Sequence, residues 1–193
     1  MKKLLITGFE PFGGEETNPS WDAVCQLPQE LGSYRLTKLR IPVVFGKAAE
    51  VVINAAEELH PDAILCIGQA GGRAAITPEL VAINLRHASI PDNAGFHPRD
   101  EAISPNGDTA FFSTLPVRQM ATAIQNAGIP AQVSYSAGAY VCNDVLYTLL
   151  SHFQNADIGI AFIHVPYAVN QQKTPAMDIA DIIKGLTIAI ENI

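Results

Sequence analysis

A chain of 193 residues, 48% of them hydrophobic, is long enough to bury one sizeable core. Its 19 acidic and 12 basic residues give a net charge of −7, and the basic residues do not cluster, so we expect no nucleic-acid partner. No apolar run approaches the roughly 18 residues of a membrane helix, and the apolar start is too short for a secretion signal. We therefore predict a single domain over residues 1–193 that works in the cytoplasm, away from membranes.

Apolar, β-branched runs alternate with helical patterns along the chain, which indicates an α/β fold. The expected strands are 3–7, 35–43, 63–67, 79–84, 132–135 and 158–164. The expected helices are 20–26, 47–59, 117–126, 140–153 and 176–191. The fourth helix carries one apolar stripe, formed by Val141, Val145, Leu149 and Phe153. Residues 87–108 are rich in Pro, Asp, Asn and Gly, and an irregular loop of this length is usually functional or mobile.

Three cysteines are spread along the chain without a Cys-x-x-Cys pair, so we predict no disulfide framework, no metal site and no cofactor. Cys25 and Cys66 lie in patterns typical of core residues. Cys142 differs, because it follows a Gly-containing turn and falls in the first turn of the expected helix 140–153. Unpaired N–H groups and the helix dipole there favour a thiolate, which predicts a lowered thiol pKa and a nucleophile. The spacing alone does not decide between this nucleophile and a small buried cysteine.

A thiol nucleophile needs a base within hydrogen-bond reach. Among the five histidines, His164 ends the expected strand 158–164. We expect the strands before and after the Cys142 helix to run parallel, so that both residues emerge at one sheet edge. His164 alone would be a packing or capping residue, but beside Cys142 it is the favoured base. Glu79 opens the expected strand 79–84 and is either a solvated strand end or the group that orients His164.

Several segments together resemble the pyroglutamyl peptidase type I family. They are TGFEPFGGEETNPS (7–20), ITPELVAINL (76–85), IPDNAG (90–95), STLPV (113–117), SAGAYVCNDVLY (136–147) and IHVPY (163–167). The segments run from the first expected strand to the last. The resemblance implies a cytosolic cysteine peptidase, commonly tetrameric, that removes N-terminal pyroglutamate from peptides. It also implies a three-layer α/β/α sandwich around a mixed, mostly parallel sheet.

The resemblance also implies site residues. The family's Glu–Cys–His triad carries over onto Glu79, Cys142 and His164. Its substrate pocket carries over onto Phe9, Phe12, Asn18, Gln69, Tyr140 and Val141. The two phenylalanines would form an aromatic wall for the lactam ring, although core packing is their preferred reading without the resemblance. A neutral aromatic slot with a few polar groups suits pyroglutamate, which has one amide edge and no charged amine.

One position departs from the family. The family typically has Ala-Arg before Ile-Pro-Asp-Asn, whereas this chain has Ala88-Ser89, with Arg86 as a candidate substitute. Two alternative functions stay open: a glutaminase-like hydrolase of small amides, and a catalytically silent binder of N-terminally blocked peptides, which Ser89 makes plausible. The aromatic slot argues against the first and the complete triad against the second. A nucleotide-binding site is excluded, because GFEPFGG lacks the Gly-x-Gly-x-x-Gly spacing.

Overall fold

A six-stranded mixed sheet forms the centre of the fold, in a computed structural model that describes all 193 residues. The strand order is β2-β3-β1-β4-β8-β5. The four inner strands run parallel: β1 (Lys2–Phe9), β3 (Tyr34–Ile41), β4 (Ala63–Gln69) and β8 (Gly159–Val165). The two short edge strands, β2 (Glu30–Leu31) and β5 (Thr77–Pro78), run antiparallel to their neighbours. These pairings confirm the predicted mixed, mostly parallel sheet.

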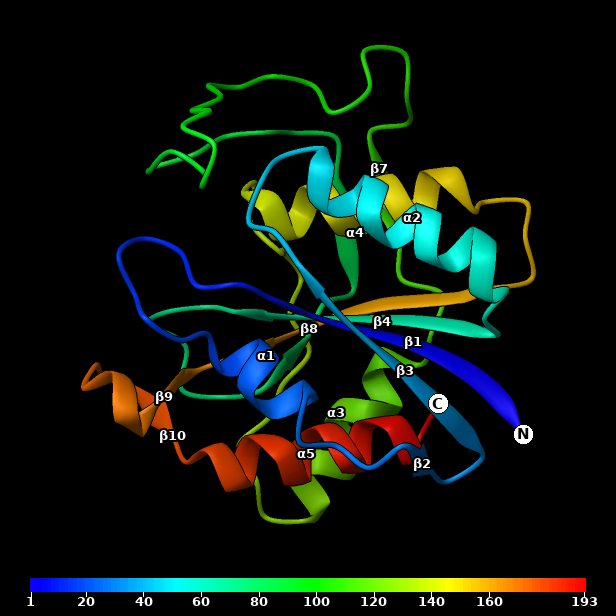
Figure 1. The fold of residues 1–193 in the computed structure, drawn as a ribbon, viewed down its shortest axis with the longest axis vertical. Coiled ribbons are helices and arrows are strands. Elements are labelled where there is room, and N and C mark those ends of the chain that lie inside the picture. Colours follow the sequence, from blue (N-terminus) through cyan, green and yellow to red (C-terminus); the bar gives the residue numbers. More distant parts are fainter.

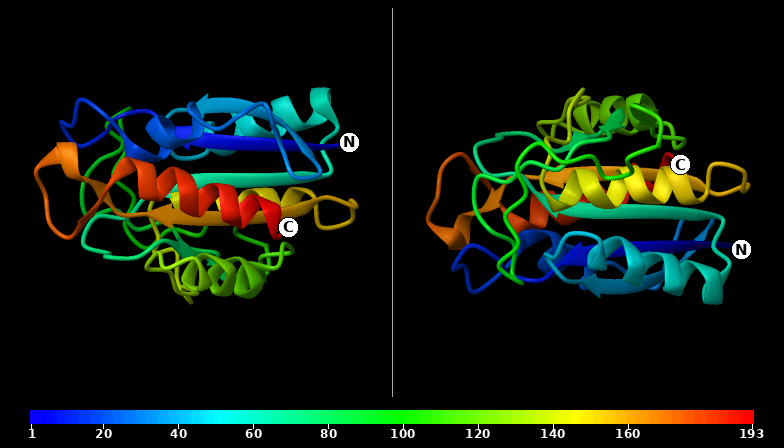
Figure 2. Two further views of the ribbon diagram at one scale, coloured as in Figure 1. Left: turned by 90° about the horizontal axis from the view of Figure 1, so that it is seen from below. Right: turned by 90° about the horizontal axis from the view of Figure 1, so that it is seen from above.

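Helices cover both faces of this sheet (Figures 1 and 2). One face carries α1 (Pro19–Val24), α3 (Val117–Asn126) and α5 (Ile179–Glu191), and the other carries α2 (Lys47–Leu59) and α4 (Val141–His152). Because both faces are covered, the central strands are apolar throughout and alternate between two cores. In β1, for example, Leu4 and Ile6 face one core and Leu5 the other. The predicted three-layer α/β/α sandwich is confirmed. None of the helices is long and apolar enough to span a bilayer.

Two small two-stranded sheets and a 3-10 helix lie outside the central sheet. Strands β6 (Val81–Ile83) and β7 (Ala110–Phe112) form an antiparallel pair, and β9 (Tyr167–Ala168) pairs with β10 (Ala176–Met177) around the 3-10 helix η1 (Val169–Gln171). Residues 87–108 contain no helix or strand, as predicted. The buried carboxylate of Asp92 nevertheless organises this loop, because it accepts hydrogen bonds from the N–H groups of Phe45, Ala94 and Phe96.

Two expected strands need correction. The strand expected at 79–84 is present only as the shorter β6, which pairs with β7 outside the central sheet. Residues 130–134 run beside the β5 segment through four backbone hydrogen bonds, but they form only two isolated bridges with it, Ile76–Ala131 and Glu79–Ser134. No sheet strand therefore precedes the Cys142 helix. The last helix also begins later than expected, at Ile179, where the Asp178 side chain caps it.

Candidate active site

A buried hydrogen bond joins Glu79 and His164 at the carboxyl edge of the sheet. The distance from His164 Nδ1 to Glu79 Oε1 is 2.7 Å, and the exposed fractions of the two side chains are 4% and 0%. Strand β5 delivers this contact, because its Thr77 is the register partner of His164 and Glu79 follows two residues later. Glu79 is therefore not a solvated strand end. Since the carboxylate holds Nδ1, Nε2 is the ring nitrogen left for chemistry.

Cys142 approaches the same edge from α4. Its Sγ lies close to Gly68 of β4, since a Cβ atom added at Gly68 would be only 3.0 Å from the sulfur. Gly68 is the register partner of His164. The same Cβ would lie 2.7 Å from Cζ of Phe162, so only glycine fits at this position. Cys142 and His164 therefore meet at one edge of the sheet, as expected. The strands that bring them together are β4 and β8, rather than β8 and a strand at 132–135. The first N–H groups of α4 have no acceptor within the helix, and such groups can stabilise an oxyanion.

Arg73 is a member of this site that the sequence analysis missed. Its Nη1 donates to Glu79 Oε1 at 2.6 Å and to Thr77 Oγ1 at 2.7 Å, and its Nη2 donates to the Ser136 carbonyl at 3.0 Å. Glu79 Oε1 thus accepts from both Arg73 and His164, while its Oε2 is buried without a partner. The only sequence signal was a single basic residue directly after Gly71-Gly72.

Burial is the leading influence on the pKa of both Glu79 and His164. Burial raises the pKa of Glu79, but the hydrogen bond and charge of His164, with Ser134 and Arg73, lower that pKa below its ordinary value. Burial also lowers the pKa of His164 below 6.5, against the opposing effect of Glu79. In the resting protein the carboxyl is therefore ionised and the imidazole is neutral at pH 7.

The thiol of Cys142 does not have the lowered pKa that the sequence predicted. Burial, followed by the negative charge of Glu79, raises its pKa above 9.0, and the opposing charge of Arg73 is weaker. The prediction considered the helix terminus and omitted the loss of water around the sulfur atom. The resting side chain of Cys142 is therefore a neutral thiol, which would have to lose its proton before or during an attack.

Two buried polar side chains anchor the first turn of α4. Asn143 bonds to the backbone of Ile83 in both directions, with Oδ1 accepting and Nδ2 donating at 2.9 Å each. The carboxylate of Asp144 accepts from Arg86 Nε at 2.6 Å and from the Gly46 N–H at 2.7 Å. Arg86 is therefore committed to Asp144 and does not replace the arginine that the family has at position 89. Two consecutive polar residues inside an apolar helix were the available signal.

A small cavity opens beside the thiol. It is lined by Phe9, Phe12, Asn18, Val43, Gln69, Tyr140 and Cys142. The structure thus brings together five of the six residues that the family resemblance placed in the substrate pocket. Val141 is the exception, because it is fully buried in the core on the α2–α4 side and does not line the cavity. Val43 is an addition that the sequence analysis missed.

Aromatic rings close the cavity on two sides. The ring of Tyr140 lies 6.2 Å from that of Phe12 and 5.3 Å from that of Phe45, and its hydroxyl donates to the Pro91 carbonyl at 3.1 Å. Phe9 is 2% exposed, so it belongs to the core as well as to the cavity wall. The loop 87–108 therefore reaches the mouth of the cavity through Pro91.

Asn18 has a structural role that the sequence analysis did not assign. Its Oδ1 accepts from the N–H and the hydroxyl of Ser20, which caps α1, and its Nδ2 donates to the Glu10 carbonyl at 3.0 Å. A carboxamide nitrogen has two N–H groups, so one donor of Asn18 is left for a ligand.

The other cysteines and histidines lie outside this site. Cys66 is a core residue as predicted, and burial raises its pKa to about 12. Cys25 is exposed at the end of α1, so its predicted core position is wrong. The helix is too short to turn that position inward. The remaining histidines lie elsewhere. His60 ends α2. His87 contacts Asp100, His97 contacts the Ala88 carbonyl, and His152 contacts Glu57.

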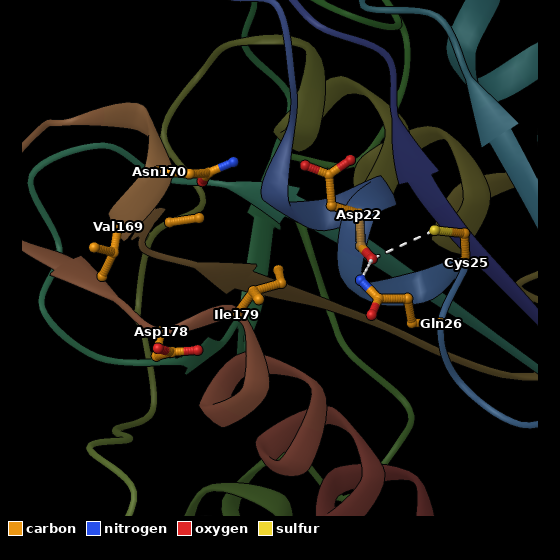
Figure 3. A pocket seen from close by; sticks show the side chains of 8 residues that line it. Asp22, Cys25, Gln26, Val169, Asn170, Asp178 and Ile179 are labelled. Atoms are coloured by element: carbon orange, nitrogen blue, oxygen red, sulfur yellow. Dashed lines mark hydrogen bonds between the residues drawn. The ribbon is translucent and has the colours of Figure 1, made fainter.

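The largest surface cavity, of about 540 Å³, is a different one (Figure 3). It lies between α1 and the segment that joins β9 to α5, and its wall includes Cys25, Asp22 and Val169. Cys25 Sγ contacts the Asp22 carbonyl at 3.4 Å, and no histidine lines the cavity. Without a base, this thiol is not placed for nucleophilic catalysis, so size does not identify the active site here.

Comparisons with known proteins agree with this geometry. A family model described as pyroglutamyl peptidase matches residues 2–193. The pyrrolidone-carboxylate peptidase of Lactobacillus johnsonii is 48% identical over 199 residues, which cover 99% of this chain and 92% of the relative. The solved structure of pyroglutamyl peptidase I from Bacillus amyloliquefaciens matches with a TM-score of 0.95 and 44% identity, over 100% of this chain and 96% of that one. The solved structure of pyrrolidone carboxyl peptidase from Thermococcus litoralis matches with a TM-score of 0.94 and 35% identity, over 99% of this chain and 92% of that one.

Proposed function

The chain belongs to the pyroglutamyl peptidase family and is a cysteine-type hydrolase that removes N-terminal pyroglutamate, and we propose that Cys142, His164 and Glu79 carry out this reaction. The observation that carries the proposal is the buried 2.7 Å bond between Glu79 and His164, together with the Cys142 sulfur beside Gly68, the register partner of His164. This arrangement supplies a nucleophile, a base and an orienting carboxylate, as acyl transfer requires.

The reaction begins with a neutral thiol and a neutral imidazole. His164 takes the thiol proton through Nε2 as Cys142 Sγ attacks the pyroglutamyl carbonyl, and Glu79 stabilises the resulting imidazolium. The N–H groups at the start of α4 hold the oxyanion. His164 then returns the proton to the departing amine, the C–N bond breaks and a thioester remains. A water molecule, deprotonated by His164, hydrolyses the thioester and restores the thiol.

The lining of the cavity beside Cys142 suits the chemistry of the pyroglutamyl ring. Its walls are aromatic and aliphatic, and its polar side chains are two carboxamides, Asn18 and Gln69. N–H donors of these groups suit the lactam carbonyl. No carboxylate lines the cavity, so an ordinary amino terminus, which is cationic, would lie there unpaired. Since a flexible glutamine chain needs no aromatic slot, the cavity favours pyroglutamyl peptides over the small-amide alternative.

Release of a fluorophore from its pyroglutamyl amide tests the triad. Cys142→Ala is expected to reduce turnover to near background, and His164→Ala to cost nearly as much, because the pair acts as a unit. Glu79→Gln is expected to be milder, since the imidazole keeps a hydrogen-bond partner. The control is His152→Ala, at an exposed position that contacts Glu57. Substantial activity in Cys142→Ala, or a larger loss in Glu79→Gln than in His164→Ala, contradicts the assignment.

We also propose a reducing cytoplasmic location and a homotetramer. The first is supported by the need for a free thiol at Cys142, and the second by the family resemblance alone. Cell fractionation and light scattering of the purified protein test the two proposals separately.

A further inference from the structure

Gln69 lines the cavity, and its carboxamide contacts a second carboxamide from outside the cavity. Gln171 Nε2 lies 2.9 Å from Gln69 Oε1. Gln171 belongs to η1, between β9 and β10, beyond the carboxyl ends of β1, β4 and β8 (Figure 1). The two residues are 102 positions apart in the chain, so only the fold brings them together.

The orientation of the Gln171 carboxamide is determined by two contacts that cannot reverse. Its Oε1 accepts from the backbone N–H of Ala168 at 3.0 Å, and a backbone N–H can only donate. Its Nε2 donates to the carboxylate Oε2 of Glu15 at 3.4 Å, and an ionised carboxylate can only accept. An ion pair between Glu15 and Lys173 keeps that carboxylate charged, because the bond from Lys173 lowers the pKa of Glu15.

The orientation of Gln171 determines that of Gln69. Because Gln171 presents an N–H group, Gln69 must present its oxygen to it. The nitrogen of Gln69 then keeps its two N–H donors, which have no acceptor within the protein. A carboxamide that was free to rotate would present its oxygen or its nitrogen to a ligand with similar ease.

We propose that Gln171 is a positioning residue that holds Gln69 with its N–H donors toward the lactam carbonyl of the substrate. The inference rests on the proposed function, because it assigns the pyroglutamyl ring to the cavity. Gln171 itself does not line the cavity and acts only through Gln69. A site that presents a fixed donor rejects rings without the carbonyl, since the donor is then left unpaired.

Three substitutions separate positioning from a merely structural role. Gln171→Glu keeps the acceptor for Ala168 but can only accept from Gln69, so Gln69 turns and presents its oxygen to the substrate carbonyl. Gln171→Met keeps the length of the side chain and imposes no orientation. Gln172→Glu adds the same charge on the exposed neighbouring residue and serves as the control.

The measured quantities are kcat/KM on a pyroglutamyl fluorogenic amide and the inhibition constant of 2-pyrrolidone, the bare lactam. Gln171→Glu is expected to lower kcat/KM and to weaken 2-pyrrolidone binding by on the order of 100-fold each. Gln171→Met is expected to lower kcat/KM and to weaken 2-pyrrolidone binding by about tenfold each, and Gln172→Glu to behave as the wild type. In a Gln69→Ala background, Gln171→Glu should have no further effect.

The failures are distinguishable. A wild-type protein that does not cleave the pyroglutamyl amide overturns the proposed function itself. A wild type that cleaves it, together with equal losses in Gln171→Glu and Gln171→Met, overturns only the role of Gln171. An additive loss in the Gln69→Ala background has the same meaning.

Discussion

The charge of Arg73 should help to keep the acid limit of the reaction low. Arg73 Nη1 lies 2.6 Å from the buried Glu79 carboxylate, and the arginine side chain is 29% exposed. Two charge centres about 4 Å apart interact by roughly 4 kcal/mol at an effective dielectric constant of about 20. Because solvent reaches the guanidinium, about half of this, ~2 kcal/mol, is a reasonable expectation for the interaction.

The direction of the effect follows from both neighbours of Arg73. Its positive charge lowers the pKa of Glu79 and also that of His164. In Arg73→Gln both pKa values therefore rise, so Glu79 loses its charge and His164 gains a proton at a higher pH than in the wild type. In the wild type the acid limb of kcat/KM lies below pH 6.5, because burial lowers the pKa of His164. We expect the limb of Arg73→Gln to move up by about one pH unit, with activity recovering above pH 8.

The assay is kcat/KM on a pyroglutamyl fluorogenic amide between pH 4.5 and 9, with circular dichroism at each pH to confirm folding. Arg73→Lys keeps the charge and should leave the acid limb near its wild-type position. Arg35→Gln removes one exposed arginine, which pairs with Glu30 far from the site, and is the matched control. An equal loss in Arg73→Gln at every pH, with an unmoved acid limb, would refute the electrostatic reasoning and leave Arg73 a structural residue.

Three further predictions concern the nucleophile and its cavity. In a Cys25→Ser background, iodoacetamide should alkylate Cys142 at a rate that rises about tenfold per pH unit from pH 6 to 8, because burial raises the thiol pKa. An alkylation rate that is already constant below pH 7 would indicate a resting thiolate. Gly68→Ala should destabilise the protein in urea unfolding by about 1–3 kcal/mol, and should lower kcat/KM on the order of 100-fold by displacing the sulfur; unchanged kinetics would contradict the contact. A prolyl amide should react on the order of 10⁴-fold more slowly than a pyroglutamyl amide. Asn18→Ser keeps a helix cap but removes the free N–H donor, so it should reduce the ratio of the pyroglutamyl to the prolyl rate. Comparable wild-type rates on the two amides would disprove the predicted preference for pyroglutamate.

The sequence by itself determined the parts of this protein that depend on local pattern. The runs 3–7 and 63–67 lie within β1 and β4, and 158–164 matches β8 to within one residue, because a strand buried on both faces is apolar throughout. The helices at 47–59 and 117–126 have the predicted bounds. Cys142 was recognised from the turn before it and His164 from the end of its strand. Family resemblance then supplied five of the cavity residues, but it wrongly included Val141 and missed Val43.

Only the tertiary structure decided how these residues work together. The bond between Glu79 and His164 spans 85 positions, and the strand that was expected to lead to Cys142 does not exist. Arg73 belongs to the site because the loop before β5 brings its side chain onto Thr77 and Glu79. No periodic pattern in the sequence predicts this contact. The sign of the thiol pKa shift also depended on packing. A helix terminus can be read from sequence, but the loss of water around a sulfur atom is a property of everything packed against it.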